Sequence, residues 1–145
     1  MSKVENAIAV FKEGFNCSQA IFSTYGPQFG IEREIALRIA CPFGAGMAGK
    51  SQTCGAVTGA LMVIGLKWGN TKSEDRKLKE NAYKIAGELA AGFKARNGSL
   101  NCSELLGYDL GTPEGFKTVY EKNMMVTHCA KFVRDAAEIL EELLK

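Results

Sequence analysis

Four of the five cysteines occupy the same kind of position in the sequence, one or two residues after a residue that commonly begins a helix. An asparagine precedes two of them, in NCSQ (residues 16–19) and NCSE (residues 101–104). Both tetrapeptides resemble a capping box, in which Asn caps a helix and Gln or Glu three residues later bonds back. Threonine takes the capping position in TCGA (53–56) and THCA (127–130). The sequence therefore predicts that four cysteines lie in the first turns of four helices: Cys17, Cys54, Cys102 and Cys129.

The start of a helix favours negative charge, because its N–H groups are unpaired and its dipole is positive there. A thiol at such a position is expected to have a lowered pKa, and the thiolate is both the nucleophile and the metal ligand. Cys41 differs, because Pro42 follows it and places it near a helix end. A single cysteine is most simply a buried apolar side chain. Four at one kind of position favour a shared redox or metal centre.

Four thiolates match the ligand set of an iron–sulfur cluster of the [2Fe–2S] or [4Fe–4S] type, which is the first expectation for this centre. No close Cys-x-x-Cys pair is present, so we expect such a cluster to be lost in air. Zinc ranks lower, because zinc sites usually draw ligands from close pairs. A metal-free thiol–disulfide switch or oxidoreductase is the alternative, and four cysteines allow three pairings.

Other catalytic and cofactor signals are few. His128 adjoins Cys129 and is a further candidate ligand or proton donor, although a lone histidine at a helix start is more often solvated. No Cys-x-x-Cys-His occurs, so no haem is expected. No paired acids or Ser/His/Asp set is recognisable, which disfavours a hydrolase and leaves open whether the protein is an enzyme.

A glycine-rich segment suggests a different class of function. GAGMAGKS (residues 44–51) matches the phosphate-binding pattern G-x-x-x-x-G-K-[ST] letter for letter. In that interpretation Lys50 contacts phosphate and Ser51 binds magnesium. The pattern requires a preceding buried strand, whereas EREIALRIACPF has helical spacing and then a proline. The sequence therefore favours a structural role for these glycines, which would let the backbone pass close to a buried site, over nucleotide binding.

Five pieces of the chain, in order, carry a resemblance to a known family: FNCSQA, FGAGMAG, CGAVTGALMVIGLKWG, NCSELLG and HCAKFV. They resemble proteins described as redox-active and named for their C-GCAxxG-C-C cysteine pattern. The resemblance carries the family's four shared cysteines to Cys17, Cys54, Cys102 and Cys129, and it leaves Cys41 and Lys50 outside the pattern. It implies a small helical redox protein without an established reaction.

The elements that must position these residues have helical patterns throughout. Apolar residues recur on one face in the stretch that ends near Gly98 and in the C-terminal stretch 127–145. Pro113 follows a Thr cap and starts another helix. Further helices fit residues 3–13, 17–25, 32–41 and 54–66, the last with glycines four apart that would admit another backbone. No stretch predicts a strand. We expect an all-α, single-domain bundle of about six or seven helices over residues 1–145.

The composition of the chain limits the classes of binding partner to expect. A net charge of +2, with 46% hydrophobic and 23% charged residues, is ordinary for a globular domain and suggests neither nucleic acid nor a membrane surface. The first residues do not resemble a signal peptide, and the longest apolar run is too short to span a bilayer. The sequence thus predicts a cytoplasmic protein with an unidentified redox partner protein, and it is compatible with a homo-oligomer.

Overall fold

The computed structural model describes residues 2–145, and within them it contains helices and no strands. The α-helices are α1 (Lys3–Lys12), α2 (Cys17–Tyr25), α3 (Arg33–Ala40), α4 (Gly55–Trp68), α5 (Arg76–Asn97), α6 (Cys102–Leu106), α7 (Pro113–Glu121) and α8 (Ala130–Leu144). Three single turns complete them: the 3-10 turns η1 (Gly26–Phe29) and η2 (Cys41–Phe43), and the π-helical turn η3 (Met125–Cys129). The all-α prediction is confirmed. The described residues hold eight α-helices, one more than the upper end of the expected range, and the shortest of them is α6 with five residues.

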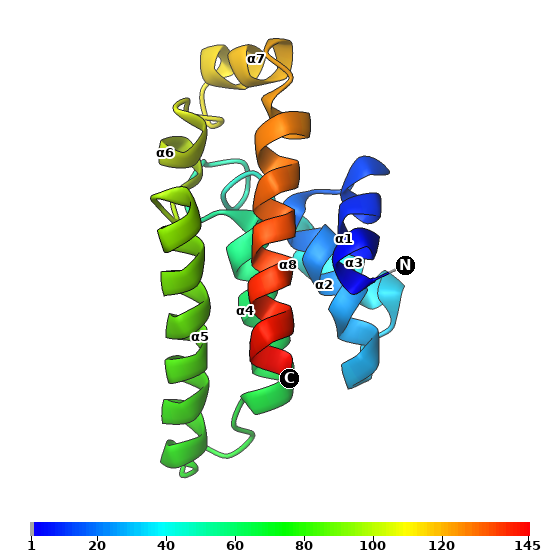
Figure 1. The fold of residues 1–145 in the computed structure, drawn as a ribbon, viewed down its shortest axis with the longest axis vertical. Helices are drawn as coiled ribbons and strands as arrows, with labels where there is room; N and C mark the ends of the chain where they lie inside the picture. The colour runs from blue at the N-terminus through cyan, green and yellow to red at the C-terminus, as the bar shows by residue number, and fades with distance from the viewer. Residues whose placement is uncertain (1) are drawn as a thin grey trace.

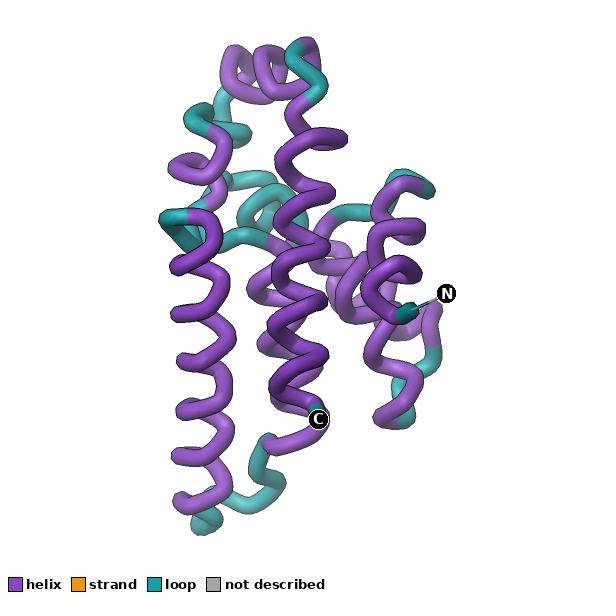
Figure 2. The backbone as a smooth tube through the Cα atoms, viewed as in Figure 1, coloured by secondary structure: helices purple, strands orange, loops and turns teal. Residues whose placement is uncertain are grey.

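The three longest helices set the shape of the molecule. Helices α4, α5 and α8 pack on one another along the longest axis, and α1, α2 and α3 form a smaller group against α4 and α8 (Figure 1). Figure 2 shows loop segments gathered where α4 begins, between the long helices and α6. The site described below forms at this end of α4.

Helix α4 is the central helix because it is apolar on most of its surface. It buries residues on several faces, whereas α8 buries a single stripe that includes Phe132, Val133, Ala136 and Leu140, as its sequence pattern predicts. One continuous cluster of buried apolar side chains joins the helices. Among the described residues, no helix combines the length and apolar character that crossing a bilayer requires.

Two glycines allow α2 to cross α4 at short range. A Cβ atom at Gly59 would lie 2.9 Å from the Ser18 carbonyl oxygen and 3.1 Å from the Ile21 Cβ. A Cβ at Gly55 would lie 3.0 Å from the Ser18 amide nitrogen and 3.3 Å from the Cys17 Cβ. The expected close backbone approach is thus present, and it brings the start of α2 against the start of α4.

Candidate functional site

The tetrapeptide NCSQ begins α2 and also holds α3 in place. The Asn16 side chain accepts a hydrogen bond from the Gln19 N–H (2.9 Å), and the Gln19 side chain accepts one from the Asn16 N–H (3.0 Å). This is the predicted capping box, and Cys17 is the first residue of the helix. The remaining amide groups donate to the carbonyls of Cys41 and Leu37, each at 3.0 Å. Cys17 therefore sits on a helix start that is fixed from two sides.

The tetrapeptide NCSE makes only half of the predicted box. The Asn101 side chain accepts a hydrogen bond from the Glu104 N–H (3.2 Å), so Asn101 caps α6 and Cys102 is its first residue. The Glu104 carboxylate instead accepts from the Ser99 hydroxyl, which itself accepts from the Asn101 N–H, both at 3.0 Å. The capping residue is as predicted, but the reciprocal bond is replaced by Ser99.

A short backbone pairing brings the next two cysteines to one face. Thr53 and Asn101 form an antiparallel bridge, flanked by hydrogen bonds from the Cys54 N–H to Leu100 (2.9 Å) and from the Cys102 N–H to Gln52. Side chains alternate between the two faces of paired strands, so the residues that directly follow Thr53 and Asn101 point to the same face. Cys54 and Cys102 therefore face one space, although they come from segments far apart in the chain.

This pairing corrects one prediction about α4. Thr53 belongs to the bridge and does not cap the helix, which starts at Gly55 with Cys54 in the N-cap position. The Cys54 backbone is extended there (φ −55°, ψ 133°), and its side chain makes no capping bond. Cys54 is therefore still at the start of α4, but it is the N-cap residue and not the first residue of the helix.

The prediction that Thr127 caps a helix with Cys129 in its first turn is wrong. Thr127 does not cap a helix, since the π-helical turn that begins at Met125 runs directly into α8. The Thr127 hydroxyl and amide both contact the Asn123 carbonyl (3.3 Å each), where a positive φ of 57° turns the chain after α7. Cys129 is thus placed by a π-helical turn inside a continuous helix, and π-helical turns are frequent at functional sites.

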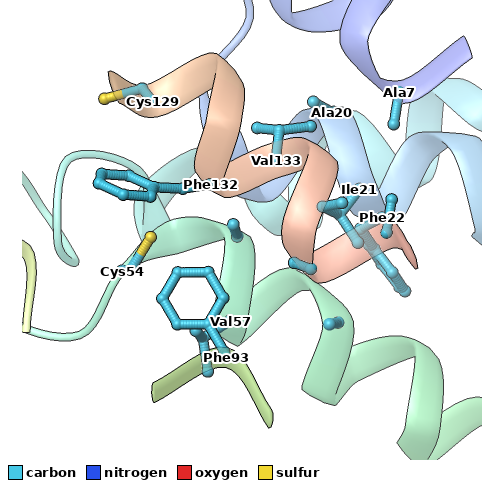
Figure 3. Packing of buried hydrophobic residues seen from close by; sticks show 14 of the residues in the cluster. Ala7, Ala20, Ile21, Phe22, Cys54, Val57, Phe93, Cys129, Phe132 and Val133 are labelled. Carbon is cyan, nitrogen blue, oxygen red and sulfur yellow. The ribbon is translucent and has the colours of Figure 1, made fainter. Parts of the chain in front are cut away.

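All four of these thiols line one cavity of about 430 Å³. Its remaining wall is mainly apolar, and the sequence did not indicate that these residues share one cavity: Phe11, Phe15, Ala45, Leu105, Leu106, Leu110, Met125, Val126, Ala130 and Phe132, with Lys12 and Asn16 among the polar exceptions. Figure 3 shows Cys54 and Cys129 on the two sides of the Phe132 ring. Only contacts between distant segments create this wall, so no local pattern marks it.

Two of the thiols lie close enough to affect each other's ionisation. Contact with the Cys17 thiol is the main cause that lowers the pKa of Cys129. The contact with Cys129, followed by burial and the nearby charges of the other three cysteines, raises the pKa of Cys17 well above its ordinary value. Of the two, Cys129 therefore ionises more readily, and Cys17 keeps its proton.

The other two thiols are held neutral by burial. Burial raises the pKa of Cys54 to about 12, although the N–H groups of Ala56 and Val57 at the start of α4 act in the opposite direction. Burial likewise raises the pKa of Cys102 to about 11, against a lowering contribution from the Ser51 hydroxyl. A helix start contributes about 0.3–1 kcal/mol, whereas a rise of three pKa units corresponds to about 4 kcal/mol. The expected lowered pKa is therefore wrong for Cys17, Cys54 and Cys102.

The remaining candidates lie away from the cavity wall. Cys41 is exposed in η2, and its carbonyl accepts the bond from Asn16. His128 is exposed, with its Nδ1 2.8 Å from the Thr127 hydroxyl oxygen, and it does not line the cavity. Within residues 2–145, no three His, Cys, Asp or Glu side chains are placed to hold a single metal ion.

The glycine-rich loop has a backbone unlike a phosphate-binding loop. Four of its non-glycine residues have positive φ: Ala45, Met47, Ala48 and Ser51. The N–H groups from Met47 to Gln52 all donate to backbone carbonyls within residues 42–47, so none of these six is free for phosphate. Helix α3 and η2 precede the loop, and α4 starts only at Gly55. The required strand–loop–helix context is absent from the described chain, and the loop instead covers the cysteine cavity with Ala45 and Gly46.

Comparison with known proteins gives one match. A family model described as "Putative redox-active protein (C_GCAxxG_C_C)" matches residues 15–143, a span that contains all four cavity cysteines. No match was found among curated proteins or among solved structures. In this chain the central motif has cysteine before glycine, Cys54-Gly55-Ala56, followed by Gly59. Because the match covers most of its length, the chain belongs to the C_GCAxxG_C_C family of redox-active proteins.

Proposed function

We propose that Cys17, Cys54, Cys102 and Cys129 form one redox centre that holds an iron–sulfur cluster and transfers or senses electrons. The observation that carries this proposal is the convergence of four thiols on one cavity from α2, α6, η3 and the residue before α4. Four cysteines are the usual ligand set of such clusters. When bound, the cluster would supply reversible one-electron chemistry.

The donor set fits a cluster better than a single ion. Each cysteine binds its own iron in a [4Fe–4S] cluster, so the ligand sulfurs stand farther apart than around one ion. This agrees with four thiols on one cavity and with no three side chains in residues 2–145 placed around one ion. Zinc, which gathers its sulfurs at about 2.3 Å from one centre, therefore has less support. Burial does not oppose ligation, because a coordinating metal deprotonates the thiol.

A metal-free dithiol is the second candidate, and the contact between the Cys17 and Cys129 thiols, which lowers the pKa of Cys129, favours it. The Cys129 thiolate would attack one sulfur of a substrate disulfide and release the other as a thiolate. Cys17 would then displace the bound sulfur, giving a Cys17–Cys129 disulfide and a second substrate thiol. Two electrons and two protons pass to the substrate in this exchange.

The proposal also covers the cell compartment and the redox partner of the centre. All five cysteines are free thiols, which suits a reducing compartment such as the cytoplasm. Electrons must come from or go to a second molecule, and we propose a redox partner protein rather than nucleic acid or a membrane component.

Anaerobic purification tests the cluster. We expect iron and acid-labile sulfide in similar amounts and a visible absorption band that bleaches on reduction. Serine at position 17, 54, 102 or 129 should each abolish the band, because the remaining thiolates would crowd together without their cation. Cys41→Ser is the matched control and should retain it, since Cys41 lies outside the cavity.

Two outcomes would decide against the cluster. Absence of iron and sulfide after anaerobic reconstitution would reject it directly. Loss of thiol redox activity in Cys17→Ser and Cys129→Ser, with full activity in Cys54→Ser and Cys102→Ser, would support the dithiol instead.

A further inference from the structure

The cavity beside the four thiols opens to solvent between the end of α1 and η3. Lys12 is the last residue of α1 and Val126 lies in η3, and both line the cavity. Both are also exposed, Val126 to 58%, whereas the wall residues Leu106 and Leu110 are buried. A molecule from solvent can therefore enter beside Lys12 and Val126 and reach the thiols.

The cavity is large enough to hold a small molecule. Its volume of about 430 Å³ lies within the range of small-molecule sites, about 300–1,000 Å³, and an apolar cavity of about 150 Å³ already holds one benzene molecule. The part of the wall that carries no sulfur is formed by aromatic and aliphatic side chains, among them Phe11, Phe15 and Leu105. This surface suits the apolar body of a ligand with one ring or a chain of roughly eight carbon atoms.

The charges on the cavity wall favour a negative group on the ligand. Among the described residues, no Asp or Glu lines the cavity, and Lys12 is the one charged residue that does. Lys12 forms no ion pair in residues 2–145. The neighbouring acid, Glu13, is paired with Arg33 at 3.4 Å. The ammonium group of Lys12 is therefore free to pair with an anion at the opening.

The glycine-rich loop adds two free hydrogen-bond donors. Ala45 and Gly46 line the cavity, and Gly46 is buried. The N–H groups from Met47 to Gln52 are all paired, but those of Ala45 and Gly46 make no hydrogen bond within the described chain. Buried N–H groups without a partner are rare in native proteins. Like Lys12, these groups can only donate, so the wall favours an occupant that accepts hydrogen bonds.

We propose that the cavity binds a small apolar acid, a medium-chain or aromatic carboxylate, with its apolar body beside the thiols and its negative group within reach of Lys12. The flexible stem of a lysine lets the ammonium follow such a group at the opening. A molecule held there covers the thiols, so it controls the access of oxidants and partners to the redox centre. This control rests on the proposed function, whereas the binding of the acid does not.

Calorimetry on the metal-free, reduced protein tests the binding, with octanoate as the acid and octanol as its neutral match. We expect saturable binding of both by wild type. Lys12→Gln should weaken octanoate binding about three- to fivefold and leave octanol binding unchanged, because only the acid loses an ion pair. Lys50→Gln is the matched control, since Lys50 is an exposed lysine of the covering loop that does not line the cavity. Val126→Phe should weaken the binding of both molecules, because it narrows the opening.

Thiol labelling with iodoacetamide shows where octanoate binds. At about ten times its dissociation constant, octanoate should slow the labelling of Cys129 about tenfold, because only about a tenth of the protein is then unoccupied. Cys41 is exposed and lies outside the cavity, so it should be labelled at the same rate with and without octanoate. Mass spectrometry follows the two cysteines in one sample.

Three results would overturn the inference. They are the absence of saturable octanoate binding by wild type, equal octanoate affinities for wild type and Lys12→Gln, and an unchanged labelling rate of Cys129 at saturating octanoate. Failure of the protein to take up iron after anaerobic reconstitution would instead count against the proposed cluster. The binding and labelling results would still judge the acid site, because both are measured without metal.

Discussion

At Cys129 the neighbouring Cys17 thiol lowers the pKa, whereas the same contact raises the pKa of Cys17, so two residues of the same type differ in acidity. For Cys54 and Cys102 no neighbouring thiol lowers the pKa, and burial keeps both protonated. Position at a helix start has a smaller effect: the N–H groups of Ala56 and Val57 act to lower the pKa of Cys54, but burial outweighs them. The acidity of each thiol is therefore set by its neighbours.

The buried thiols predict a loss of stability at alkaline pH. Below about pH 9 these thiols are protonated in both folded and unfolded metal-free protein. Between 9.0 and about 12, the pKa of Cys54 before and after burial, the unfolded chain loses the proton while the folded chain keeps it. The free energy of unfolding should therefore fall as pH rises, by at most about 1.4 kcal/mol per pH unit per thiol.

Urea unfolding of the reduced protein from pH 7.5 to 10.5 measures this slope. Cys54→Ala removes one buried thiol and should make the slope shallower. Cys41→Ala removes an exposed thiol and should leave it unchanged. Equal slopes for wild type and Cys54→Ala would show that burial of Cys54 does not suppress its ionisation.

At the scale of the elements, the crossing of α2 over α4 decides where Cys17 lies. Gly59 on α4 contacts the first turns of α2 at a distance that leaves no room for a Cβ, and Gly55 leaves very little. The same crossing brings the Cys17 Cβ against the start of α4, next to Cys54. Helix packing and the geometry of the thiol site therefore depend on the same contact.

Alanine at two glycines of α4 should have opposite effects. Gly59→Ala would force α2 away, because its Cβ would lie 2.9 Å from a backbone oxygen, and we expect a loss of about 1–3 kcal/mol in unfolding free energy. Gly65→Ala meets nothing within 4 Å on the same helix, so it should stabilise the protein by about 0.5–1 kcal/mol. Thermal or urea unfolding compares the two. A neutral Gly59→Ala would mean that the two helices can separate at little cost.

For the whole molecule, the thiols come together only when four separate segments are assembled. Cys17 lies near the start of the described chain and Cys129 near its end, on helices that both pack on α4. Each of the two thiols is the main influence on the pKa of the other, which makes them the pair that we expect to oxidise first. A bond between them would link α2 covalently to the beginning of α8.

Mild oxidation of the metal-free protein should therefore give a Cys17–Cys129 disulfide first. The bond closes a loop that includes most of the chain, and constraining the unfolded state should stabilise the oxidised protein by up to about 4 kcal/mol. Peptide mapping identifies the linked pair, and urea unfolding with and without reductant measures the gain. Cys17→Ser should abolish both, whereas Cys41→Ser should preserve them. A dominant disulfide that excludes Cys129 would contradict the assigned contact.

Features that depend on residues a few positions apart could be predicted from the sequence. The Asn16–Gln19 box, the Asn101 cap and Pro113 in the first turn of α7 are all found, and Gly98 ends α5 with a φ of 88°. The apolar stripe of α8 is also correct. Each is determined by hydrogen bonds or spacing within a few turns of one segment. The resemblance to a redox-active family likewise required only the order of the cysteine motifs, and the family match confirms it.

Features that depend on contacts between distant segments were decided by the tertiary structure. Thr53 has the sequence of a cap, but it pairs with Asn101 because the two segments meet at the start of α4. Cys129 follows a capping threonine, but the turn after α7 continues into α8 as one helix. The pKa directions of the thiols and the apolar cavity wall arise in the same way. Burial and the approach of a second charged or donor group are properties of the assembled core, and for these thiols they outweigh the local helix dipole that the sequence pattern reveals.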